Sequence, residues 1–452
     1  MPTFEEVRQL VESKKKVFDN IDEMLSQYRG EIHHIDDYNG RQLLELLQNA
    51  DDAFEDFTPA DDKDPEVAID LNTQNKILVV KNNGRDFSFD GIRSLLYANL
   101  SSKVSSKTIG NKGLGMRAIL GWAKELKIYT SYCILTFSKQ IAKDFFEDKV
   151  PDEATRNKII RDKWGDNTGD IVPVPILSVP IVEPFASKYG GQVTFEIAYE
   201  DDKEQDIINR INDLNENILL FLNHLKEISI NVDDNYTEYH CQVSNENDYK
   251  TYSVNDKVFK VYTREGNIPD YLVEKDRDIV RDKYNVEIAL PETFDQDASN
   301  VLYCYFPTQV KVNLPFLVHG TFEIDSSRSR LLPTKINDFI FTQLAELIDV
   351  VAEKIKKEEC SWRPYDMLSN WRAVENSRFQ QTMIRIFLSA VVYPTISGNY
   401  VSKDKAKYFG EEFSTYWEGH SKYTIFNLVS PGRQGSLEIS NLTDSDVSAI
   451  NS

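Results

Sequence analysis

The order of apolar and polar positions predicts a chain of mixed helices and strands. Phe4, Val7, Leu10 and Val11 recur at helical spacing, which predicts an amphipathic helix over residues 4–29. Further helices are predicted over about 39–54, 90–98 and 203–222. Strands are predicted over 67–71, 76–82, 126–131, 133–138, 190–197, 227–232, 259–263, 286–290 and 301–307. The first two strands are separated by a short polar turn, which predicts a hairpin.

The remaining segments complete a pattern typical of α/β or α+β proteins. Residues 139–189 contain the proline-rich run "VPVPILSVPIVEP" and are predicted to be irregular. Residues from about 336 to 430 are predicted to be mostly helical, and the last twenty are polar and predicted to be loose. Helices that alternate with strands, followed by a second mixed unit, favour these two classes.

Composition and charge narrow the function classes. The chain has 452 residues, of which 41 % are hydrophobic, so it can bury a sizeable core. Its formal net charge of -21 argues against non-specific binding to nucleic acid or to an anionic membrane. The four cysteines lie far apart and show no metal-ligand spacing. The charged N-terminus lacks the apolar region of a signal peptide, and no run is long enough to span a bilayer. We therefore expect a cytoplasmic protein.

The stretch "GRQLLELLQNADDAF", residues 40–54, combines an apolar stripe with a polar one. Glu45, Asn49 and Asp52 share one helix face, because they are spaced i, i+4 and i+7. An amide oxygen such as that of Asn49 can bind Mg²⁺ when phosphates supply further oxygens. A carboxylate one turn away could orient or deprotonate a water molecule. Taken alone, however, the pattern favours a solvated helix face with an acidic end.

Two glycine-containing loops add candidate chemistry. Gly110, Gly113 and Gly115 precede a predicted helix, whose N-terminal N–H groups could bind phosphate, and Lys112 could add a charge. The spacing is neither that of a Walker A loop nor that of a Rossmann fingerprint. In the second segment, "VVKNNGRDF", a strand runs into an Asn-Asn-Gly turn. This turn could present a side-chain hydrogen-bond acceptor to the edge of a nucleotide base. A plain turn is the simpler interpretation of each loop taken alone.

These pieces occur in an order that resembles the GHKL ATPase superfamily, named for gyrase, heat-shock chaperone, histidine kinase and MutL. The nearest resemblance is to the sacsin-type branch, in which "ELLQNADDA", "NNGRxF", "SSK" and "IGNKGLGxR" recur in nearly this wording. The match covers about residues 30–330. It implies a Bergerat-type ATPase sandwich, an α+β fold with helices on a mixed, mostly antiparallel sheet, that binds ATP and Mg²⁺.

The resemblance also implies a role for each matching residue. Glu45 stands at the general base that activates water, and Asn49 stands at the Mg²⁺ ligand. Nucleotide contacts are implied for Asn49, Asp52, Asn82, Gly84, Lys103, Gly110, Lys112, Gly113, Leu114 and Gly115. Among these, Asn82 and Gly84 match the D-x-G adenine motif, and the later glycines form the second glycine box. In related chaperones the second domain sends an arginine to the γ-phosphate, and here the candidate is Arg328, with Arg330 in reserve.

Two departures from the family pattern fall on the adenine pocket. The family's adenine-reading aspartate is Asn82 in this chain, which keeps an acceptor oxygen but carries no charge. Gly191 stands where the chaperones have a threonine before a strand. We therefore expect a rearranged pocket that selects adenine less strictly, with phosphate and Mg²⁺ binding less affected.

The resemblance predicts four segments and a switch function. They are a helical arm (1–30), an ATP-binding domain (31–225), a transducer-like α/β domain (226–335) and a mostly helical region (336–452). The expected function is slow ATP hydrolysis coupled to lid closure and to homodimer association. A separate effector subunit of nuclease or helicase type is also expected, as in bacterial restriction or anti-phage systems. The alternatives are a nucleotide-binding or chaperone-like scaffold with little hydrolysis and, less favoured, a DNA-processing enzyme. Direct nucleic-acid binding by this chain alone is not expected.

Overall fold

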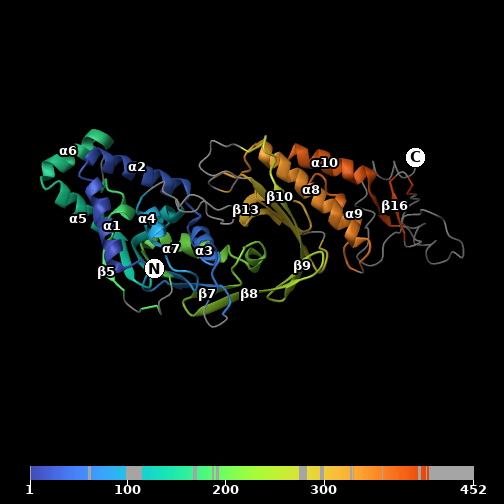
Figure 1. Cartoon of the computed structure of the whole chain (residues 1–452), viewed down its shortest axis with the longest axis horizontal. Coiled ribbons are helices and arrows are strands. Elements are labelled where there is room, and N and C mark those ends of the chain that lie inside the picture. Colours follow the sequence, from blue (N-terminus) through green and yellow to red (C-terminus); the bar gives the residue numbers. More distant parts are fainter. Residues whose placement is uncertain are drawn as a thin grey trace. The chain divides into compact units, whose positions relative to one another are not determined.

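The chain divides into two compact units, Met1–Cys241 and Gln242–Ser452, and Figure 1 shows the elements of each. The computed structural model describes residues 2–59, 63–97, 115–165, 171–185, 188–189, 193–273, 282–295, 300–325, 328, 330–358, 360–394, 399–403 and 405–406. No helix in these ranges is long and apolar enough to cross a membrane. Mixed helices and sheets confirm an α+β class.

The sheet of unit 1 has the strand order β8-β7-β1-β2-β6-β3-β4-β5. Its strands are β1 (Glu66–Asn72), β2 (Ile77–Asn82), β3 (Ala123–Tyr129), β4 (Cys133–Ser138), β5 (Ile181–Pro184), β6 (Val193–Tyr199), β7 (Glu227–Val232) and β8 (Asn235–Asn245). All neighbours pair antiparallel except β1 and β7, which pair parallel. The β1–β2 pair confirms the predicted hairpin. On β2 buried residues alternate with partly exposed ones, which is typical of a strand with one face against helices.

Two helices occupy the segment for which one helix was predicted. These are α1 (Phe4–Val17) and α2 (Ile21–Asp37), so the prediction of a single helix over 4–29 is wrong. The Asn20 side chain caps α2 by accepting hydrogen bonds from the N–H groups of Asp22 and Glu23, at 3.1 and 3.4 Å. A side-chain acceptor at this position starts a new helix, because it satisfies N–H groups that the first turn leaves unpaired.

The helices that follow include two that the sequence pattern missed. They are α3 (Gln42–Asp52), α4 (Phe89–Leu96), α5 (Lys139–Lys149), α6 (Glu153–Trp164) and α7 (Glu204–Asn212). Three-residue or longer 3₁₀ segments are η2 (Gly115–Gly121), η3 (Ile176–Ser178), η4 (Asp201–Lys203) and η5 (Glu216–Leu220). The prediction of an irregular segment over 139–189 is therefore wrong. The helix predicted over 203–222 is interrupted after Asn212, where Asn215 caps η5.

In unit 2 the sheet has the strand order β13-β12-β14-β11-β10-β9. Its strands are β9 (Lys250–Val254), β10 (Lys257–Asn267), β11 (Lys283–Pro291), β12 (Asn300–Cys304), β13 (Phe306–Val312) and β14 (Leu317–Gly320). The helices α8 (Lys335–Ile355), α9 (Pro364–Leu368) and α10 (Ser377–Ser389) follow, and a small sheet pairs β15 (Val391–Pro394) with β16 (Tyr400–Ser402).

One hydrophobic core joins the strands and helices of unit 2. Val286 and Val318 of the sheet share this core with Phe341 of α8 and Phe379 of α10. Figure 1 shows α8 and α10 along one face of the sheet that contains β10 and β13. The predicted segment boundary at 335 therefore falls inside unit 2. The prediction of helices after 336 is confirmed as far as 389. It is wrong for 391–402, where β15 and β16 pair, and residues 407–452 lie outside the described residues.

Candidate functional site

Helix α3 packs by its apolar stripe and turns its polar stripe into the interior of unit 1. Leu43, Leu47 and Ala50 are at most 1 % exposed, as the sequence pattern predicted. On the polar face, Glu45 and Asp52 are only 5 % and 6 % exposed. A solvated helix face would expose these carboxylates, so the simpler interpretation of this motif is wrong for both residues.

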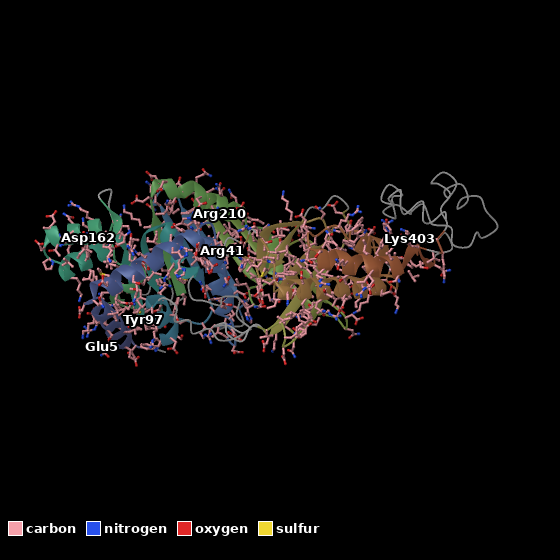
Figure 2. All side chains as sticks on the ribbon, turned by 90° about the horizontal axis from the view of Figure 1, so that it is seen from above. Glu5, Arg41, Tyr97, Asp162, Arg210 and Lys403 are labelled. Atoms are coloured by element: carbon pink, nitrogen blue, oxygen red, sulfur yellow. The ribbon has the colours of Figure 1, made fainter. Side chains whose placement is uncertain are left out.

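Glu45 is held by the arginine one turn before it. The Arg41 guanidinium donates to Oε1 of Glu45, and both side chains are nearly buried, at 13 % and 6 % exposed. The Arg41 guanidinium also lies over the Tyr38 ring, 4.8 Å from its centroid. Figure 2 labels Arg41 near Arg210, and a Cβ at Gly40 would lie 3.0 Å from Arg210 Nη2. Because the Arg41 guanidinium donates to Oε1 of Glu45, it fixes that oxygen and leaves Oε2 to face another direction.

The other oxygen of Glu45 meets the last glycine of the glycine-rich motif. A Cβ built on Gly115 would lie 1.8 Å from Oε2 and 2.5 Å from Cδ of Glu45. Real Cβ atoms essentially never approach a heavy atom below 3.0 Å, so only glycine fits while Glu45 stays in place. The start of η2 and the carboxylate of α3, which are 70 positions apart in the sequence, are therefore in direct contact.

Asn49 connects the same two elements one turn further along α3. Its Nδ2 donates to the Glu45 carbonyl at 2.8 Å and lies 3.2 Å from the Met116 sulfur. Because these contacts use the amide nitrogen, they fix the orientation of the carboxamide. The carboxamide oxygen is the atom with which an asparagine would bind a cation.

The turn after β2 lies against the C-terminal end of α3. The N–H of Arg85 donates to the Ala53 carbonyl at 2.9 Å, and a Cβ at Gly84 would lie 2.8 Å from Ala53 Cβ. Asn82 is 5 % exposed, and its Oδ1 accepts the Gly84 N–H at 3.0 Å. The structure thus brings this turn against Ala53, the residue that follows Asp52, and the Asn82 oxygen already stabilises the turn itself.

The two adjacent aspartates of "NADDA" have different surroundings. Asp51 is fully buried and accepts hydrogen bonds from the backbone N–H groups of Asn223, His224 and Leu225, at 3.3, 2.9 and 2.9 Å. Burial raises the pKa of Asp51, whereas these hydrogen bonds act in the opposite direction. Asp51 is therefore a structural residue that holds the segment before β7, and Asp52 is the one that belongs to the polar stripe.

Several predicted ligand residues cannot be placed. Lys103, Gly110, Lys112, Gly113, Leu114 and Gly191 lie outside the described residues. Of the glycine box, the structure places Gly115 alone. Within the part of the chain that is described, no three His, Cys, Asp or Glu side chains are grouped as a metal site. A Mg²⁺ ion that is bound mainly by phosphate oxygens and one amide needs no such group.

The two candidate arginines lie on a turn of unit 2. Arg328 is 7 % exposed, has φ of +57°, and donates from Nη1 to the carbonyls of Cys304 and Phe306 at 3.0 and 3.5 Å. The Arg330 side chain is 83 % exposed and forms an ion pair with Asp325 at 3.3 Å. The first candidate is thus engaged by carbonyls of its own unit, and the reserve candidate is accessible to solvent.

The sequence interpretation missed residues that complete this arrangement. Arg41 contacts the predicted base Glu45, Met116 contacts the predicted ligand Asn49, and Asp51 fixes the end of α3. The i, i+4 spacing of Arg41 and Glu45 is a signal that could have identified the ion pair. The contact with Met116 has no comparable signal, because it depends on how η2 packs against α3.

Comparisons with known proteins add no assignment. No protein-family model matches the chain, and a search of curated proteins finds no match.

Proposed function

We propose that this chain is a Mg²⁺-dependent ATPase of the GHKL type, built on a Bergerat-type fold, that works as a nucleotide-controlled switch. The observation that carries the proposal is the contact between Gly115 and Oε2 of Glu45. Because of this contact, the Glu45 carboxylate lies beside the end of the glycine-rich motif. A site that binds a triphosphate and activates a water molecule requires these two groups to be neighbours. The proposal thus rests on two elements that the sequence motifs selected independently.

The described residues fit such a ligand. Because Gly115 has no Cβ, the Glu45 carboxylate, which Arg41 holds, can lie directly against the end of the glycine-rich motif. Asn49 would hold the cation through its carboxamide oxygen, since its nitrogen contacts the Glu45 carbonyl and Met116. Bound Mg²⁺ would neutralise phosphate charge and align the triphosphate. Asp52 and the turn at Asn82 and Gly84 would lie toward the sugar and base.

Glu45 would act as the general base. Oε1 accepts the Arg41 guanidinium, so Oε2 is the atom that would take the proton from the attacking water. Arg41 would act as a positioning residue, because it sets which oxygen faces the glycine turn. The arginine that would stabilise the charge developing on the phosphoryl group stays a prediction of the family resemblance. We keep Arg328 as the first candidate and Arg330 as the reserve.

The test is phosphate release by the wild type and by Glu45→Gln, with ATP binding measured in parallel by calorimetry. Removal of a general base lowers turnover by about 10²–10⁴-fold, whereas binding should change little. Asp56→Asn is the matched control, since Asp56 follows α3 but is exposed. Equal rates for the wild type and Glu45→Gln, with ATP bound, would exclude base catalysis by this residue.

The second candidate function is a nucleotide-binding scaffold that hydrolyses little. The feature that favours it is Asn82, whose oxygen already accepts the Gly84 N–H and which carries no charge. Such a pocket would select adenine less strictly than an aspartate would. A scaffold would bind ATP and GTP with similar affinity and release phosphate at the same low rate in the wild type and in Glu45→Gln.

A further inference from the structure

A pocket in unit 1 lies among helices α1 and α2 and the end of α4. Its volume is about 290 Å³, roughly ten times the volume that one water molecule occupies in the liquid. Lys14, Glu23, Gly30 and His34 of these two helices line it, together with Tyr97 at the end of α4. Tyr97 is labelled in Figure 2. The pocket can therefore accept a small organic molecule.

The ammonium group at this pocket is buried without an anionic partner. Lys14 is 1 % exposed, and its Nζ donates to Gln27 Oε1 at 2.6 Å. The rings of Tyr97 and Phe18 lie 4.3 and 4.9 Å from Nζ. Among the described residues Lys14 forms no ion pair. Its ammonium group has three N–H donors but contacts only one neutral acceptor and two aromatic rings.

The charged groups around Lys14 do not compensate for this burial. Burial, reinforced by the nearby Arg117 guanidinium, lowers the pKa of Lys14 to about 8, and Glu23 and Glu31 oppose that shift. The Glu31 carboxylate is used elsewhere, because it accepts the N–H groups of Ile176 and Leu177 at 2.5 and 3.1 Å. A buried charge without a close counter-ion is costly, and an oxyanion in the pocket would remove that cost.

Gly30 is an independent indication that the pocket is kept open. It lies in the interior of α2, where glycine is the least favourable residue apart from proline. A Cβ at Gly30 would meet no heavy atom within 4 Å, and its φ is not in the left-handed region. Neither packing nor backbone conformation therefore requires glycine here. A larger side chain would instead extend into open space, and Gly30 lines the same pocket as Lys14.

We propose that this pocket binds a small oxyanion, a carboxylate or a phosphate group, with Lys14 as the charged contact and Tyr97 as an aromatic wall. His34 would add a donor, and Glu23 would limit the affinity for multiply charged ligands. None of the residues that line this pocket is a proposed nucleotide contact, so the proposal does not depend on ATP hydrolysis.

The test follows the Lys14 side chain by NMR in full-length protein labelled with ¹³C-lysine. Acetate and inorganic phosphate are the two probes, and each is titrated separately. Saturable binding should shift the Lys14 Cε resonance and raise the pKa of Lys14. A response to acetate alone indicates a carboxylate ligand, and a response to phosphate alone indicates a phosphate-bearing one. Phosphate that bound only at the proposed nucleotide site would leave the Lys14 resonance unchanged, which would count against the proposal.

Matched variants, in which probe binding is measured by calorimetry because Lys14→Met has no Lys14 resonance, separate binding from folding. Lys14→Met and Gly30→Leu should each weaken probe binding by about tenfold or more, since a charge-assisted contact or the space for the ligand is lost. Gly30→Leu should also melt at the same temperature as the wild type or higher, so its loss of binding cannot be attributed to unfolding. Glu23→Gln should bind more tightly, and the exposed Lys16→Met should match the wild type. No response of Lys14 to either probe, or equal losses in Lys14→Met and Lys16→Met, would overturn the proposal.

Discussion

Replacement of Gly115 by alanine tests how closely the glycine turn and the Glu45 carboxylate must fit. The added Cβ would lie 1.8 Å from Oε2, whereas ordinary contact begins at 3.4 Å, so the carboxylate oxygen must move by 3.4 minus 1.8, or 1.6 Å. A displacement of about 1 Å in a catalytic group can lower turnover by about 10²-fold. We therefore expect Gly115→Ala to lower phosphate release by about 10²-fold or more.

The assay combines phosphate release, calorimetric binding of Mg²⁺-ATP and chemical denaturation. Overpacking of this kind costs about 1–3 kcal/mol of stability, so the variant should remain folded. Gly121→Ala is the matched control on the same 3₁₀ segment, because its Cβ would lie 3.3 Å from the flexible end of Gln42. Full turnover in a folded Gly115→Ala protein would refute the inferred contact, and an equal loss in Gly121→Ala would show that the effect is not specific.

Three further predictions concern stability. Arg41→Met breaks a nearly buried ion pair and should cost about 3 kcal/mol in urea denaturation, whereas Arg8→Met, at an exposed pair, should cost less than about 1. Equal losses of stability in Arg41→Met and Arg8→Met would contradict the burial of the Arg41–Glu45 pair. Asp51→Asn turns an amide N–H₂ toward backbone donors and should cost about 3 kcal/mol; a change within error would show that those three hydrogen bonds do not form. Because the pKa of Lys14 falls from 10.5 to about 8 on folding, the unfolded chain binds more protons between these values. The free energy of unfolding should therefore rise with pH across that window, by up to about 3 kcal/mol relative to Lys14→Met, while Lys16→Met keeps the wild-type slope; parallel curves for the wild type and Lys14→Met would contradict the prediction.

The sequence predicted those elements whose burial leaves a periodic pattern. The β1–β2 hairpin follows from alternating apolar residues around a polar turn, and the apolar stripe of α3 follows from its helical spacing. Helix α6 was missed because none of its described residues is buried, so it carries no apolar stripe for a pattern to detect. The break between α1 and α2 depends on the Asn20 cap, which interrupts an otherwise continuous helical pattern.

Local sequence could identify the polar motif of α3 but not the distinct roles of neighbouring residues. Asp51 and Asp52 are chemically identical, and what distinguishes Asp51 is a segment more than 170 positions away whose backbone N–H groups donate to its carboxylate. The Gly115–Glu45 contact was implied only by the resemblance, since the spacing of either motif says nothing about their distance. The hydrogen bond from Arg328 to the Cys304 carbonyl could not be predicted from local sequence or from the resemblance, because it depends on how unit 2 packs.

A structure of the protein with Mg²⁺ and a non-hydrolysable ATP analogue would show whether α3 and the glycine-rich motif bind the nucleotide. We expect the terminal phosphate beside Gly115, Mg²⁺ in contact with the Asn49 oxygen, and Oε2 of Glu45 facing the position of the attacking water. A nucleotide bound elsewhere on the chain, or Glu45 turned away from the phosphates with Gly115 uninvolved, would contradict this expectation.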